Sequence, residues 1–271
     1  MELTKERSKS SIWMLIAAIA ALMLLAEPLM NTYLGIAVSY ESTYGFYPET
    51  FLKELFGEAF GGMLGLIYRL NLMFSQGIYG LGIAILTVSL FILAFKPQWR
   101  FLPVIGVLLL WWNRLTAFVW SIILKIFATI YSNNQYNHIE DYYGSRYVYD
   151  EVFIKAREVF AYIAEFFVVL ALFLLLFTTF LHAIKKTRKI SKFVGVLPVL
   201  SHAAALLLNL LSMFLYVVTE KSAWTDVTPH ALMFGYYALP LFVVFLFVWL
   251  GILLDKRDKK QLVSDTPQTV A

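Results

Sequence analysis

Six long apolar stretches, separated by polar segments, form the main pattern of this chain. Each contains about 19 or more mostly apolar residues, the length that a helix needs to cross a hydrocarbon core of about 30 Å. Inside a bilayer the backbone has no water to bond, so each stretch must satisfy its own amide and carbonyl groups as a helix. The pattern therefore predicts an all-α integral membrane protein with six transmembrane helices, at Ile12–Leu34, Gly77–Phe95, Val104–Ile130, Phe160–Ile184, Phe193–Val218 and Ala231–Leu254.

The composition supports a membrane protein and excludes several kinds of chemistry. The chain is 60% hydrophobic and 15% charged, whereas a soluble domain has about 25% charged residues. We expect one six-helix membrane domain over residues 1–254 and a polar cytoplasmic tail over residues 255–271. The absence of cysteine excludes disulfides, thiol catalysis and Cys-ligated metals.

The distribution of basic residues predicts the orientation, because cytoplasmic loops carry an excess of Lys and Arg. One alternating set of connections holds most of the cations, namely Lys5, Arg7, Lys9, Lys96, Arg100, Lys185, Lys186, Arg188, Lys189, Lys192, Lys256, Arg257, Lys259 and Lys260. We therefore expect a multi-pass protein of a bacterial-type inner (plasma) membrane with both termini in the cytoplasm. The first stretch has the basic start of a signal peptide, but no convincing small-residue cleavage site follows Leu25, so we expect it to remain as a span.

The first outer segment, Tyr40–Gln76, is too long for a simple loop. Within Phe51–Phe74 the apolar positions recur at steps of three and four residues, and the charged residues lie elsewhere on the helical wheel. This pattern predicts an extracytoplasmic amphipathic helix over 51–74. The helix either packs against the outer ends of the bundle or lies at the membrane interface, as a lid over an outward-facing cavity. Gly77, Gly80 and Gly82 in the following span indicate a helix-packing face.

The second outer segment, 131–157, is rich in tyrosine and acidic residues. Its His138, Glu140 and Asp141 match no metal-site spacing, so we expect neither a metal nor a cofactor. Tyrosine is common at the level of lipid headgroups and in protein interfaces. We expect segments 41–76 and 131–157 to contact other membrane proteins, the spans to contact the lipid bilayer, and no nucleic acid to bind.

Arg114 is the most unusual polar residue, because it lies near the middle of the third predicted span. A guanidinium at that depth costs about 2.5–3.5 kcal/mol unless it is paired or hydrated. Its neighbour Asn113 points about 100° away, whereas Lys125 lies about 20° from the same helix face, so the third span has a cationic stripe that runs outwards. Glu27 and Glu165 lie at a depth similar to that of Lys125, in the outer parts of the first and fourth spans.

The fifth span has a matching polar stripe, since His202 and Asn209 are seven residues apart and His202 lies near the depth of Arg114. In one interpretation Arg114, His202 and Asn209 line a cavity that opens to the outside, with the outer charges at its mouth. Such a cavity suits an anionic solute, a lipid headgroup or a proton relay through His202.

A structural interpretation stays open beside this one. Here Lys125 pairs with Glu27 or Glu165, and Arg114 bonds to Asn209, so that the polar groups only hold the helices together. The two interpretations differ in whether the polar stripe faces water or another helix.

The chain contains no Walker A, His-Glu-x-x-His or Gly-x-Ser-x-Gly motif. The leading hypothesis is therefore a non-enzymatic subunit of a larger membrane assembly. The first alternative is a small transporter or channel with a cationic cavity centred on Arg114, for an anionic solute or a lipid headgroup. The second alternative is a membrane-embedded enzyme that modifies lipids.

Overall fold

The computed structural model describes residues 9–25, 52–53, 56–96, 99–136, 148–184, 192–220 and 238–264, and the described chain is helical without strands. Its main elements are α1 (Lys9–Met23), α5 (Glu58–Phe95), α6 (Leu102–Tyr136), α7 (Val148–Ala183), α8 (Lys192–Glu220) and α10 (Leu239–Ser264). Four of them contain segments long and apolar enough to span a membrane: Gly77–Phe95, Leu102–Ile123, Val159–Ala183 and Gly195–Leu215. The prediction of an all-α chain is therefore confirmed for the described residues, and these four helices are compatible with a membrane-embedded protein.

The first and sixth predicted spans are described only in part. The apolar helical segments there are shorter, at Ile12–Met23 and Leu239–Leu254. Residues 26–34 and 231–237, which would complete the two spans, lie outside the described residues. Four spans are therefore supported by helix length and composition, and the other two stay predictions.

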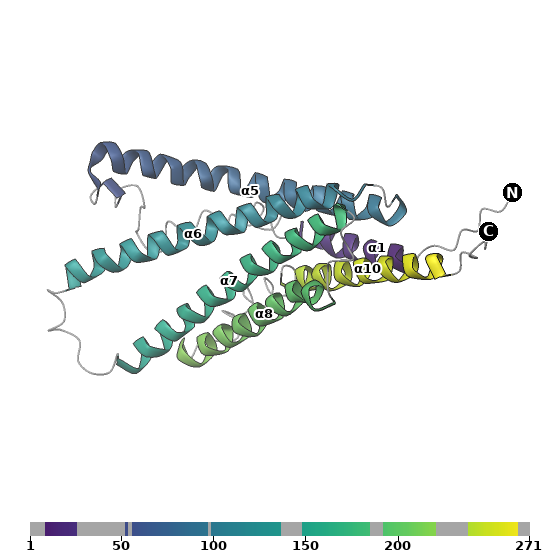
Figure 1. The fold of residues 1–271 in the computed structure, drawn as a ribbon. Coiled ribbons are helices and arrows are strands. Elements are labelled where there is room, and N and C mark those ends of the chain that lie inside the picture. Colours follow the sequence, from purple (N-terminus) through teal and green to yellow (C-terminus); the bar gives the residue numbers. More distant parts are fainter. Residues whose placement is uncertain are drawn as a thin grey trace, which may run out of the picture.

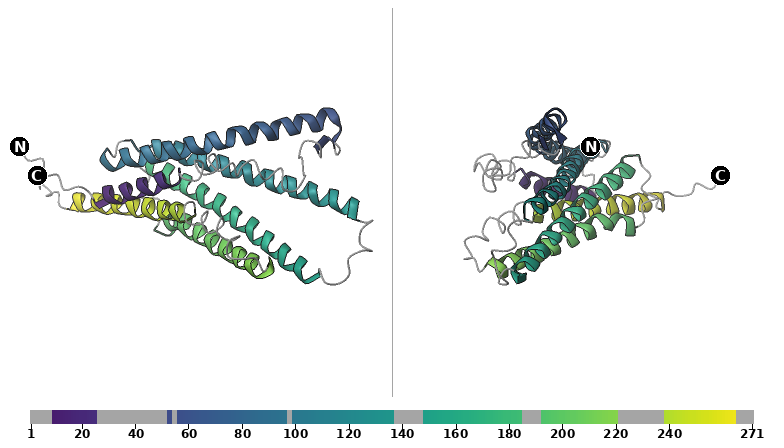
Figure 2. Two further views of the ribbon diagram at one scale, coloured as in Figure 1. Left: turned by 180° about the vertical axis from the view of Figure 1, so that it is seen from behind. Right: turned by 90° about the vertical axis from the view of Figure 1, so that its left-hand side faces the viewer.

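The helices form a bundle that is narrow at one end (Figure 1). Helices α5 and α6 make one packed pair, α7 and α8 make a second, and α1 packs between α10 and α5. The two long pairs lie close together where α5 ends and α6 begins, which we call the inner end, and separate towards the outer end, as Figures 1 and 2 show. Helix α1 starts and α10 ends at the inner end (Figure 1).

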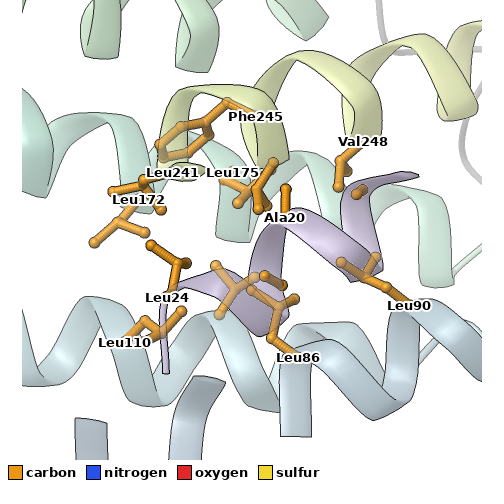
Figure 3. Close-up of a cluster of buried hydrophobic side chains, with 14 of the residues drawn as sticks. Ala20, Leu24, Leu86, Leu90, Leu110, Leu172, Leu175, Leu241, Phe245 and Val248 are labelled. Carbon is orange, nitrogen blue, oxygen red and sulfur yellow. The ribbon is translucent and has the colours of Figure 1, made fainter. Parts of the chain in front are cut away.

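Small side chains allow α1 to lie in the centre of the inner half. Ala17 and Ala21 are fully buried, and the Met14 side chain fills the space that a Cβ on Gly251 of α10 would occupy. Figure 3 shows Leu24, near the end of α1, with Leu110 of α6 on one side and with Leu172 of α7 and Leu241 and Phe245 of α10 on the other. Residues from α1, α5, α6, α7, α8 and α10 thus form a single apolar core.

Glycines determine how closely α5 and α6 approach. A Cβ on Gly106 would lie 2.7 Å from the backbone nitrogen of Leu86, and one on Gly82 would lie 3.1 Å from the Cβ of Leu109. The expected packing role is thus confirmed for Gly82. A Cβ on Gly77 or Gly80 would meet no atom within 4 Å, so these two glycines do not serve this packing within the chain.

The prediction of a separate amphipathic helix over 51–74 is wrong in its boundaries. Residues 58–76 are continuous with the following span in the 38-residue helix α5. The helix begins after Gly57, whose φ of 79° lies in the left-handed region that favours glycine. The physical reason is that nothing at Gln76 or Gly77 interrupts the hydrogen-bond ladder, whereas the backbone at Gly57 does.

The boundaries at the remaining ends also differ from the predictions. In the tyrosine-rich segment, residues 131–136 end α6 and residues 148–157 begin α7, while 137–147 lie outside the described residues. Helix α10 continues past Leu254 to Ser264, so the predicted polar tail begins as helix. Helices in this protein therefore extend beyond their apolar windows.

Candidate functional site

Arg114 lies at an interface of three helices. Its Nη1 is 4.0 Å from Oε1 of Glu165 on α7, and the two side chains are 19% and 34% exposed. The guanidinium also lies 5.1 Å from the ring centroid of Tyr79 on α5, which is a cation–π contact. The expectation that the bundle supplies a partner at the depth of Arg114 is thus met by a carboxylate and an aromatic face.

Asn113 connects α6 to α5 in the same layer. Its Nδ2 donates a hydrogen bond of 2.8 Å to the backbone carbonyl of Ser75. The side chain is 8% exposed, so the bond satisfies a buried amide. Because adjacent helical residues point about 100° apart, Asn113 and Arg114 reach different neighbours from one turn of α6.

Two aromatic contacts between α6 and α7 lie on either side of Arg114 along α6. Phe118 lies 6.3 Å from Phe166 of α7, and Trp111 lies 5.8 Å from Phe173 of α7, measured between ring centroids. Both contacts connect α6 to α7.

His202 belongs to a different interface. Its Nε2 donates a 3.0 Å hydrogen bond to the carbonyl of Ala238, next to the start of α10. The side chain is 1% exposed, and its ring lies 5.0 Å from that of Phe245 and 6.3 Å from that of Phe242. His202 therefore connects α8 to α10.

The structure does not bring the predicted site residues into one cavity. Arg114 lies beside Glu165 of α7, whereas Asn209 is exposed on α8, and the predicted Arg114–Asn209 bond stays a prediction. Lys125 is exposed two residues beyond the candidate span of α6, and Glu27 lies outside the described residues. The physical reason is that α7 packs on both α6 and α8 and keeps them apart, which depth along a helix does not reveal.

A second cluster of polar side chains, which the sequence analysis did not predict, lies near the inner end. Arg100, Thr179 and His182 line a cavity of about 10 Å³ together with apolar side chains of α1 and α10. That volume accommodates about one water molecule. His182 and Thr179 are each 5% exposed. Because they are three residues apart, they lie on the same face of α7, and this spacing is the sequence feature that could have predicted the cluster.

The chemistry of these residues is hydrogen bonding and ion pairing between helices. Within the described ranges, no group of three or more His, Asp or Glu side chains is placed to hold a metal ion. His138, Glu140 and Asp141 lie outside these ranges. Comparisons with protein-family models, with curated protein sequences and with solved structures find no match to this chain.

Proposed function

We propose that this membrane protein is a subunit of a larger membrane assembly and that the outer half of α5 is its contact surface. Arg114, Asn113 and His202 each contact a neighbouring helix of the same chain, so these polar residues serve the packing of the bundle. A transporter centred on Arg114 has less support, because its guanidinium is paired with Glu165 at a helix interface.

The length of α5 is the observation that carries the proposal. Its 38 residues extend about 57 Å, whereas the candidate span Gly77–Phe95 needs only about 29 Å. Residues 58–76 therefore reach about 28 Å beyond the span, past a hydrocarbon core of about 30 Å. This outer half of α5 must be stable in the headgroup region and in water.

The outer half of α5 is nevertheless apolar on its exposed face. Phe60 is 51% exposed, Met63 49%, Ile67 46%, Leu70 42% and Phe74 62%. Five half-exposed side chains of about 200 Å² each expose about 500 Å², which equals the largest apolar patch of a typical monomer. Because this part of α5 lies beyond the candidate span, we take the patch as a surface for a protein partner.

Affinity purification from native membranes in a mild detergent tests the proposal. We expect a particle larger than the 31.1 kDa chain, and we expect the double variant Ile67→Gln/Leu70→Gln to reduce its mass. Val159→Gln on α7 is the matched control, because Val159 is 53% exposed at the outer edge of its span. A monomeric wild-type protein without partners, or equal losses in both variants, would contradict the proposal.

A further inference from the structure

The exposed face of α5 has a strict heptad pattern along its whole length. From residue 60 to residue 95 the positions alternate between steps of three and four residues, and they carry only apolar side chains or glycine. We call this set the α5 seam: Phe60, Met63, Ile67, Leu70, Phe74, Gly77, Leu81, Ala84, Val88, Phe91 and Phe95. All are exposed except Ala84, which is half-buried.

This periodicity is the signature of helix pairing. An average spacing of 3.5 residues is shorter than the 3.6 residues of a straight helix, so the seam stays on one side only if two helices supercoil around each other. The alternation continues here over more than four heptads, with the spacing of the contact positions in a coiled coil. Contact with lipid alone requires no such pattern, and residues 58–76 lie beyond the candidate span Gly77–Phe95.

We infer that the α5 seam pairs with the α5 seam of a second copy of this chain, in a parallel two-helix contact; this rests on the proposed function. The partner helix must cross the membrane and project as far as α5 does. All copies share one orientation in the membrane, so a two-fold axis along the membrane normal aligns two seams in parallel and in register. The seam contains no charged residue, so its pairing with itself brings no like charges together.

Small residues in the middle of the seam support a close approach. Gly77 lies in the seam and Gly80 lies beside it, and a Cβ on either would meet no atom within 4 Å. Together with Ala84, these residues form a surface without large side chains near the outer edge of the span. Small residues of this kind allow two membrane helices to approach closely, and α6 already packs on the other side of α5, at Gly82.

The exposed area also fits a dimer. Nine large seam side chains are between 42% and 62% exposed. At about 200 Å² each they expose on the order of 900 Å² per copy, close to the ~800 Å² that each partner buries in a standard stable interface. One α5–α5 contact would therefore cover the seam.

Single cysteines test the inference directly, since the chain contains none. Met63→Cys and Leu70→Cys lie in the outer half of the seam, and Val159→Cys on α7 is an equally exposed control at the outer edge of its span. Upon oxidation in native membranes, we expect the apparent mass to double from 31.1 kDa for the two seam variants. We expect no shift for the control.

A photoactivatable maleimide on the same cysteines separates this inference from the proposed function. Adducts with a different protein, without a homodimer, would overturn self-association and leave the assembly proposal standing. No protein adduct at either seam position would overturn both. Gly77→Phe provides an independent readout, because the added side chain has open space within the chain. We expect this variant to fold and to give less disulfide-linked dimer. An unchanged yield of dimer would count against a seam contact.

Discussion

Arg114 lies beside groups of two neighbouring helices. The guanidinium lies 4.0 Å from the carboxylate of Glu165 and 5.1 Å from the ring centroid of Tyr79. Because the pair is partly exposed, solvent screens its attraction. Removal of either partner alone leaves the other charge unpaired at a partly buried helix interface, so the two residues should act as a unit.

A double-mutant cycle measures this coupling. We expect the free energies of unfolding of Arg114→Gln and Glu165→Gln to be non-additive in the double variant, with a coupling of about 1 kcal/mol, in the range found between membrane helices. Unfolding of the purified protein in lipid–detergent micelles provides the measurement. The pair Arg114→Gln and Asn209→Ala is the control and should be additive, and equal coupling in both cycles would show that Glu165 is not the specific partner.

At the scale of elements, the α5–α6 pair is close-packed through glycine. The backbone of Leu86 occupies the space where a side chain on Gly106 would begin. Close packing of backbones strengthens dispersion contacts between membrane helices, for which no hydrophobic driving force exists inside lipid. Whether a glycine serves close packing therefore depends on which side of the helix it lies, and not on how many glycines the span contains.

Substitution of two glycines distinguishes a packed position from an open one. Gly106→Ala should destabilise the protein by about 1–3 kcal/mol, because the added Cβ would lie 2.7 Å from the Leu86 nitrogen and 2.8 Å from its Cα. Gly80→Ala should be neutral or stabilising by up to about 1 kcal/mol, since alanine favours helix and the site is open. Thermal unfolding of both variants tests the difference, and similar losses would contradict the described α5–α6 contact.

At the scale of the whole molecule, α1 and α10 connect the two ends of the chain. Trp13 stacks on Phe247 at 5.2 Å, and Met14 lies against Gly251. Because α1 starts and α10 ends at the inner end (Figure 1), the two helices run antiparallel. Lys96 and Arg100, between α5 and α6, lie at this end as well.

Reporter fusions test the orientation that the basic residues predict. A reporter at either terminus should lie in the cytoplasm, and one fused after Tyr136 at the outer end should lie on the opposite side. Alkaline phosphatase and a green fluorescent protein provide complementary readouts, because the first is active outside the cytoplasm and the second inside. Termini on opposite sides of the membrane would overturn the six-span topology. If each of the three reporters instead lay on the side opposite to the predicted one, only the orientation predicted from the basic residues would be wrong.

Much of the secondary structure follows from the sequence, but contacts between helices do not. Periodicity and length predicted helices at α5, α6, α7 and α8, with errors at their ends and with a break near residues 75–76 that α5 does not have. The site was predicted less well: Arg114 required a partner, yet depth pointed to Asn209, whereas the structure supplies Glu165. Depth follows from residue number, but the direction in which a side chain points depends on how each helix is rotated against its neighbours.

The sequence by itself determined that this protein is helical and lies in a membrane, because apolar segments of that length must satisfy their own backbone in lipid. Only the tertiary structure decided which helices meet. It separated His202 from Arg114 by placing α7 between α6 and α8, and it joined residues 58–76 to the following span in one continuous helix. Packing of α6 against one side of α5 left the heptad seam exposed on the other, since a helix face is buried only where another surface covers it.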